Sequence, residues 1–123
     1  MMRNVFGLGL AIVLAVSPAL AQETVTAQSG QETRVGWIGS LKADCSPNPA
    51  PKLRPAKLAD HGQIKLVPAE VTTNKVANCP HAKVLAVVVF YTSSSAYKGT
   101  DTFTLASDGT DEPSEHTYTI SVR

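Results

Sequence analysis

Carboxylates that could bind a metal ion are concentrated near the end of the chain, in the stretch YKGTDTFTLASDGTDEPSEHTYTISV (97–122). Ca²⁺ takes about six to eight oxygen ligands, and carboxylates commonly supply them. The carboxylates of this stretch therefore form a candidate calcium site, made of Asp101, Asp108, Asp111, Glu112 and Glu115. The Asp-x-Asp-x-Asp spacing of a calcium loop is absent, and Asp108 and Asp111 can instead stabilise a turn through backbone hydrogen bonds. We therefore favour a hairpin with a solvated acidic loop and keep calcium as the alternative.

The histidines offer a second candidate metal site, for copper or zinc, made of His61, His81 and His116. Three imidazoles can hold such an ion, but these three are far apart in sequence and only the fold could gather them. His116 also alternates with apolar residues, which is typical of a buried ring with one hydrogen bond. For the histidines, too, metal binding remains the alternative hypothesis to a structural role.

Nucleophilic catalysis is not indicated by the sequence. The serines at 93–95 lack the G-x-S-x-G context of a nucleophile elbow, and no Ser-His-Asp arrangement follows from residue order. The carboxylates of the predicted loop are poorly placed for the pKa tuning that acid–base catalysis needs. We expect a protein that is not an enzyme and has no cofactor.

Cys45 and Cys79 are the two cysteines of the chain, and both stand beside turn-forming residues. An even count in a small exported domain predicts a disulfide. Closing this loop would stabilise the fold by about 3.8 kcal/mol in the chain-entropy model. A zinc site with His81 is the alternative, but the spacing lacks the CxxC of a zinc knuckle.

The first 21 residues have the pattern of a secretory signal peptide. Arg3 precedes an apolar run from Val5 to Val16, and Ala19-Leu20-Ala21 supplies the small residues of a cleavage site. We expect cleavage after Ala21 and a single domain from 22 to 123, located in the periplasm or secreted. The apolar run is short for a membrane span of roughly 20 residues, and no later segment is apolar over a sufficient length, so we expect no span in the mature chain.

Charge balance argues against nucleic acid as a partner. Loss of Arg3 with the signal peptide leaves equal numbers of acidic and basic residues, whereas nucleic-acid binders usually carry a basic excess. The remaining charge is unevenly placed, because most of the cations precede residue 101 and half of the acids follow residue 100.

Period-two alternation predicts strands along most of the mature chain. In 115–123, His116, Tyr118, Ile120 and Val122 share one face, and 100–107 alternates similarly around Phe103 and Leu105, so the two segments predict a hairpin. The run KVLAVVVFYT (83–92) is apolar on both faces, which predicts a central strand.

Earlier segments are less regular. Residues 32–41 predict a strand with Val35 and Trp37 on one face and with bulges at Gly36 and Gly39. Residues 52–68 predict two strands around a turn at 60–62, the first an edge or bulged strand because it contains Pro55. We expect loops at 46–51 and 71–80. About seven short strands in one domain predict an all-β sandwich.

Two motifs resemble a known family. YKGTDTFTL (97–105), followed by Asp108-Gly109 and a Thr-rich last strand, resembles the end of bacterial Ig-like and cadherin-like repeats, and DHGQI (60–64) is similar to an earlier turn of these repeats. The resemblance covers roughly residues 52–123 and implies an Ig-like Greek-key β-sandwich displayed outside the cytoplasm. The chain departs from the pattern as a lone module with a cysteine pair and with Leu105 where an aromatic is usual.

These expectations combine into one functional hypothesis. We expect an exported, non-enzymatic interaction or structural module of the bacterial cell envelope, with a protein or glycan partner held by a strand edge or a loop cluster. The alternative is a periplasmic protein that binds calcium or copper.

Overall fold

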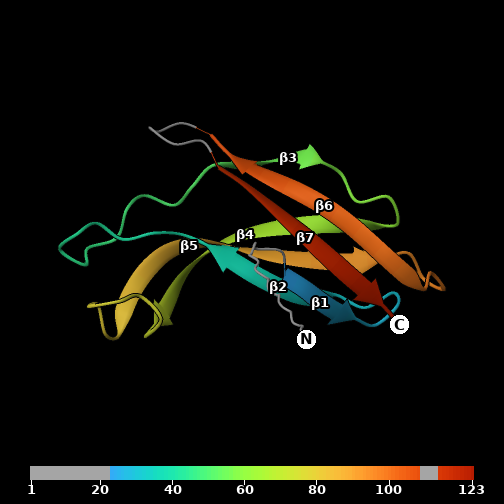
Figure 1. The fold of residues 1–123 in the computed structure, drawn as a ribbon, viewed down its shortest axis with the longest axis horizontal. Coiled ribbons are helices and arrows are strands. Elements are labelled where there is room, and N and C mark those ends of the chain that lie inside the picture. Colours follow the sequence, from blue (N-terminus) through green and yellow to red (C-terminus); the bar gives the residue numbers. More distant parts are fainter. Residues whose placement is uncertain (1–22, 109–113) are drawn as a thin grey trace, which may run out of the picture.

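The computed structural model describes residues 23–108 and 114–123, and all regular structure in them is β-strand (Figure 1). The strands in chain order are β1 (Glu23–Ala27), β2 (Thr33–Ile38), β3 (Leu53–Lys57), β4 (Gly62–Thr73), β5 (Ala82–Ser93), β6 (Gly99–Ser107) and β7 (Ser114–Val122). The all-β prediction is confirmed. The predicted signal peptide (1–21), Asp111 and Glu112 lie outside the described residues.

The strands form two sheets, with the orders β1-β7-β6-β3 and β2-β5-β4. Side chains from both sheets meet in one core that includes Tyr91 of β5, Phe103 and Leu105 of β6 and Ile120 of β7, all fully buried. The rings of Tyr91 and Phe103 stack with centroids 6.1 Å apart, across the interface between the sheets. Apolar side chains at alternate positions thus hold the two layers together.

The predicted C-terminal hairpin is confirmed. β6 and β7 pair antiparallel along their whole length, with Phe103 opposite Tyr118 and Asp101 opposite Ile120. Alternation places Tyr118, Ile120 and Val122 on the core side. This part of the fold follows directly from the period-two pattern.

β5 lies between β2 and β4, as its apolar sequence predicted. Its partner β4 is longer than expected, however, because Val71, Thr72 and Thr73 pair with Val84, Lys83 and Ala82. The prediction of a loop from residue 71 was wrong for 71–73. Pairing with a strongly β-forming neighbour extends β4 beyond what its own sequence indicates. The far end of this hairpin curls away from the other sheet in Figure 1.

β2 contains the bulge expected near Gly36, and the bulge changes which residues face the core. The pairing of β2 with β5 shifts register between Arg34 and Gly36. Val35 and Ile38 contact the core, whereas Trp37 is opposite Val88 on the outer side of the sheet. The prediction that Val35 and Trp37 share a face was wrong, because an extra residue in a strand reverses the alternation after it.

Of the two edge strands of the four-stranded sheet, the sequence predicted one and missed the other. β3 is an edge strand with an irregularity between Pro55 and Lys57, as the proline indicated. β1 was not predicted, and it pairs parallel with the last strand, β7. Its short sequence, ETVTA, is too weakly patterned to be recognised without its partner.

Candidate functional site

A buried carboxylate fixes one end of the molecule. Asp101 is only 3% exposed and accepts hydrogen bonds from the Tyr91 hydroxyl at 2.7 Å and from three backbone N–H groups at 3.0 Å, those of Asp60, His61 and Thr102. It thereby ties the turn before β4 to the core. All of this acceptor capacity is used inside the protein.

This network shifts two pKa values. Burial by itself raises the pKa of Asp101, but the hydrogen bonds from Tyr91 and from the backbone outweigh it and hold the pKa below its usual range. Burial, followed by the hydrogen bond and charge of Asp101, raises the pKa of Tyr91. The pair therefore carries a neutral phenol and a carboxylate that stays charged well into the acid range.

Loop contacts surround this carboxylate. The ring of His61 stacks on the ring of Tyr97 with centroids 4.0 Å apart and an interplanar angle of 8°, and the His61 carbonyl accepts from the Ser94 N–H at 2.8 Å. Ser29 Oγ donates to the Tyr97 carbonyl at 2.8 Å. Three loops, after β1, β3 and β5, are thus held against one another.

The predicted metal-binding residues are distributed over both ends of the molecule. Among the residues that the structure describes, no three His, Cys, Asp and Glu side chains gather closely enough to hold a metal ion. His61 and Asp101 are neighbours, but the contact is made by the His61 backbone. Asp108 forms an ion pair with Arg54 at 3.0 Å. His116 Nε2 lies 3.4 Å from Ser114 Oγ in β7, and Glu115 adjoins it.

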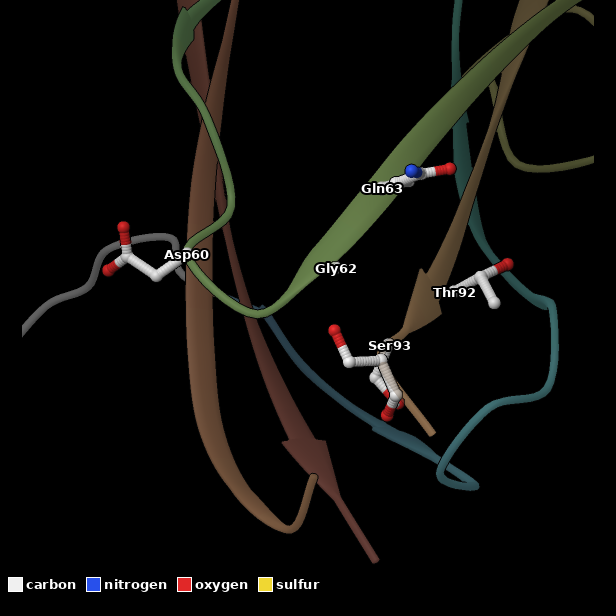
Figure 2. Close-up of a pocket in the computed structure, with 6 residues that line it drawn as sticks. Asp60, Gly62, Gln63, Thr92 and Ser93 are labelled. Atoms are coloured by element: carbon white, nitrogen blue, oxygen red, sulfur yellow. The ribbon is translucent and has the colours of Figure 1, made fainter. Parts of the chain in front are cut away.

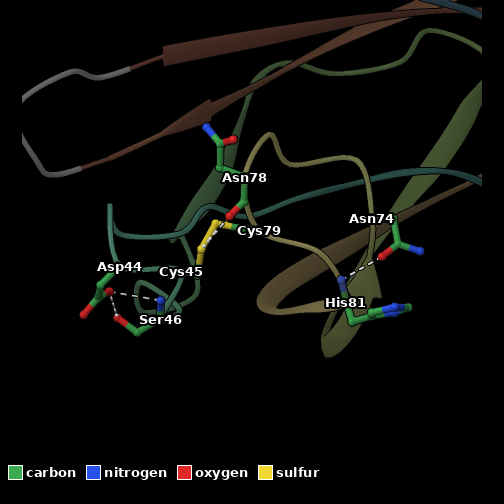
Figure 3. Close-up of a disulfide and its surroundings, with 7 residues drawn as sticks. All are labelled: Asp44, Cys45, Ser46, Asn74, Asn78, Cys79 and His81. Atoms are coloured by element: carbon green, nitrogen blue, oxygen red, sulfur yellow. Dashed lines mark hydrogen bonds between the residues drawn. A yellow bond between two sulfur atoms is a disulfide. The ribbon is translucent and has the colours of Figure 1, made fainter.

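His81 belongs to a different loop, next to the disulfide. Its backbone N–H donates to Asn74 Oδ1 at 2.7 Å (Figure 3). Cys45 and Cys79 form the predicted disulfide, with a Cα–Cα distance of 5.6 Å. The bridge joins the long connection after β2 to the loop between β4 and β5, so the zinc alternative that used these thiols is excluded.

A polar hollow of about 310 Å³ lies between the β3–β4 turn and the end of β5, lined by Asp60, Gly62, Gln63, Thr92, Ser93 and Ser94 (Figure 2). Gly62 is required here, since a Cβ would lie 2.6 Å from the Thr92 carbonyl oxygen. Gln63 and Thr92 are cross-strand partners whose side chains lie on one side, while the Asp60 carboxylate points away from them.

The outer face of the three-stranded sheet continues from this hollow. Strand pairing puts side chains there in successive rows, which are Gln63–Thr92, then Lys65–Phe90–Arg34, then Val67–Val88–Trp37. We call these eight residues the β2-β5-β4 platform. Sequence reasoning missed the platform, because only the bulge in β2 brings Trp37 to this side.

The side chains of the platform differ in how far they are engaged. Lys65 Nζ pairs with Glu32 at 2.8 Å and lies 5.1 Å from the centre of the Phe90 ring. No hydrogen bond or ion pair within residues 23–108 and 114–123 engages the side chains of Arg34, Gln63 or Thr92. Val88 is only 6% exposed, whereas Trp37 and Phe90 are partly exposed. The platform thus combines partly accessible aromatic surface with polar side chains that form no hydrogen bond or ion pair within the described residues.

Comparison with known proteins adds little. No protein-family model matches the chain, and no curated protein matches its sequence. The solved structure described as the solution structure of amebosin aligns with a TM-score of 0.46 and 9% identity, over 81% of this chain and 88% of that chain. A likeness at that level carries no argument about this protein, so its function has to be inferred from its own residues.

Proposed function

We propose that this protein is an exported, non-enzymatic Ig-like module of the bacterial envelope, in the periplasm or outside the cell, and that it works by binding a protein or glycan partner. The observation that carries the proposal is the β2-β5-β4 platform. A sheet face with partly exposed aromatic rings, and with polar side chains that have no partner among the described residues, is the kind of surface that proteins use for recognition.

The strand order supports the Ig-like part of the proposal. With the strands lettered A to G in chain order, the two sheets contain B-E-D and G-F-C, the central pattern of Ig-like sandwiches. The first strand departs from the constant-type pattern, because it pairs with the last strand instead of the second. The Asp101 network joins the two motifs, 60–64 and 97–105, that carry the family resemblance.

The disulfide supports the compartment. Disulfides persist in oxidising environments such as the periplasm and the extracellular space, and the signal-peptide pattern predicts the same destination. Within the described residues no helix is long and apolar enough to cross a membrane.

Affinity capture with a matched pair of variants tests this function. Tagged protein is expressed in the source organism, cross-linked, and recovered from envelope and culture fractions. We expect one stoichiometric partner, protein or glycan, to be captured by the wild-type protein and by Thr117→Ala, which changes an exposed residue of the other sheet, and lost with Trp37→Ala. Intact mass should show a mature chain that begins at Gln22.

Two results would contradict the proposal. One is capture of the same partners by the Trp37→Ala variant and the wild type. The other is recovery of the protein only from the cytoplasm with residues 1–21 attached. Thermal unfolding of each variant establishes beforehand that the fold is intact.

A further inference from the structure

The β2-β5-β4 platform has a definite length and shape. Its three rows are separated by two residues each, so a ligand that contacts all of them extends over about 13 Å along the strands. Trp37 lies at one end and the polar hollow at the other. A single small molecule would leave part of the surface unused, and the arrangement therefore suits an extended oligomer.

The charge of the platform is positive. Lys65 is neutralised by Glu32, whereas the exposed guanidinium of Arg34 has no partner among the described residues. The carboxylate nearest to the hollow, that of Asp60, points away from Gln63 and Thr92 (Figure 2). Arginine binds carboxylates through two parallel hydrogen bonds, which makes an anionic ligand the complementary one.

The polar chemistry favours a sugar over a peptide. The amide of Gln63 and the hydroxyl of Thr92 both donate and accept hydrogen bonds, as sugar hydroxyls do. A sheet face offers no free backbone groups, because these are paired in the plane of the sheet. A peptide would gain more at the edge of β4 that pairs with no other described strand, where backbone hydrogen bonds are available.

We infer that the β2-β5-β4 platform binds an anionic oligosaccharide, with a sugar ring stacked on Trp37, a uronate carboxylate on Arg34, and hydroxyl groups on Gln63 and Thr92. This inference rests on the proposed interaction function and names its ligand class. Phe90 lies between these groups and provides apolar surface for the middle of the ligand.

Binding of defined oligomers to the protein isolated from producing cells tests the inference. Trp37 is the single tryptophan of the chain, so a stacked sugar should change the intrinsic fluorescence directly. The probes are hexagalacturonate, the neutral maltohexaose and a hexaglutamate peptide, each also followed by calorimetry. We expect hexagalacturonate to bind more tightly than the other two and to weaken as salt is added.

Variants assign the contacts. Arg34→Gln should weaken hexagalacturonate binding about tenfold or more and leave maltohexaose binding unchanged. Trp37→Ala should abolish binding, and Trp37→Phe should restore part of it, which separates loss of stacking from loss of folding. Thr117→Ala, on the other sheet, should bind hexagalacturonate as the wild type does.

Each contrary outcome overturns a defined claim. Equal binding of hexaglutamate and hexagalacturonate, or tighter binding of maltohexaose, refutes the anionic oligosaccharide. Absence of binding to all three probes refutes it as well. If envelope capture still depends on Trp37 in that case, the interaction function stands and only the ligand class is wrong; if capture is independent of Trp37, both fail.

Discussion

The hydroxyl of Tyr91 in β5 donates a 2.7 Å hydrogen bond to the carboxylate of Asp101 in β6, and this bond joins the two sheets. The Tyr91 side chain is fully buried and Asp101 is nearly so. The same carboxylate accepts from the backbone of the turn that starts β4. One side chain therefore connects both sheets and a loop.

Replacing this carboxylate should destabilise the fold strongly. Asp101→Asn puts a donor where only acceptors fit and weakens four hydrogen bonds, so we expect the free energy of unfolding to fall by about 3 kcal/mol. Urea denaturation measures the change. Asp60→Asn is the matched control, because the exposed Asp60 carboxylate makes no hydrogen bond within the described residues; its effect should stay below about 0.5 kcal/mol. Equal effects would show that the network adds no stability.

The same network predicts acid sensitivity. Because folding lowers the pKa of Asp101, its contribution is fully present above the unfolded-state pKa of about 3.9 and is lost as the pH falls through the lower folded-state value. Stability of the wild type should therefore decrease between neutral pH and strongly acid pH by more than that of Asp101→Asn. The urea denaturation midpoints of both proteins, measured across this pH range, test whether wild-type stability falls more steeply as the pH decreases. Parallel pH profiles for the two proteins would contradict it.

Two glycines in strands should respond differently to the same substitution. A Cβ at Gly62 would lie 2.6 Å from the Thr92 carbonyl oxygen and 2.7 Å from the Tyr91 ring, whereas one at Gly36 would have nothing within 4 Å. We expect Gly62→Ala to cost about 1–3 kcal/mol through overpacking and Gly36→Ala to be close to neutral. Thermal unfolding compares them. A neutral Gly62→Ala would show that the turn can shift at no cost.

The disulfide should stabilise the protein and hold a covering segment in place. The connection after β2 packs on the outer side of β5, where a Cβ at Gly39 would meet Val84, and the bridge at Cys45 anchors it. The double variant Cys45→Ser/Cys79→Ser should lose about 2–5 kcal/mol and bind more of an apolar dye. Reduced wild-type protein is the control and should behave alike. Unchanged stability of both would refute the stabilising role.

Metal binding is the competing prediction, and calorimetry decides it. Asp101 accepts four hydrogen bonds from protein groups and Asp108 pairs with Arg54, so both would have to give up partners to bind calcium. We expect no heat when chelator-treated protein is titrated with Ca²⁺, Cu²⁺ or Zn²⁺ at micromolar concentration. Heat that disappears in Asp108→Asn or in His61→Gln would support the metal-binding function instead and identify the site.

Much of the fold could be predicted from local pattern. The alternation around Phe103 and Tyr118 identifies the β6–β7 hairpin, the apolar run at 83–92 identifies a central strand, and Pro55 identifies an edge. These are consequences of side-chain period and backbone chemistry, which act over a few residues. The disulfide could likewise be predicted from the even number of cysteines and from the export that the signal-peptide pattern indicates.

The candidate site could not be predicted in the same way. Trp37 reaches the outer face because a bulge shifts the register of β2 against β5, and a bulge changes every later side chain's face. Asp101 stabilises the fold through hydrogen bonds from a turn about 40 residues earlier in the chain. In the sequence, Asp101 is one of several acidic residues near the end of the chain, and calcium binding was therefore the alternative prediction for it.

By itself, then, the sequence determined the all-β class, the disulfide and the core-facing residues of the last two strands, because alternation and composition are local properties. Only the tertiary structure decided that β1 pairs parallel with β7, that Asp101 is committed to the fold, and that Arg34, Trp37 and Gln63 share one surface. These relationships depend on pairing register between distant strands, and one residue of register changes which side chains meet.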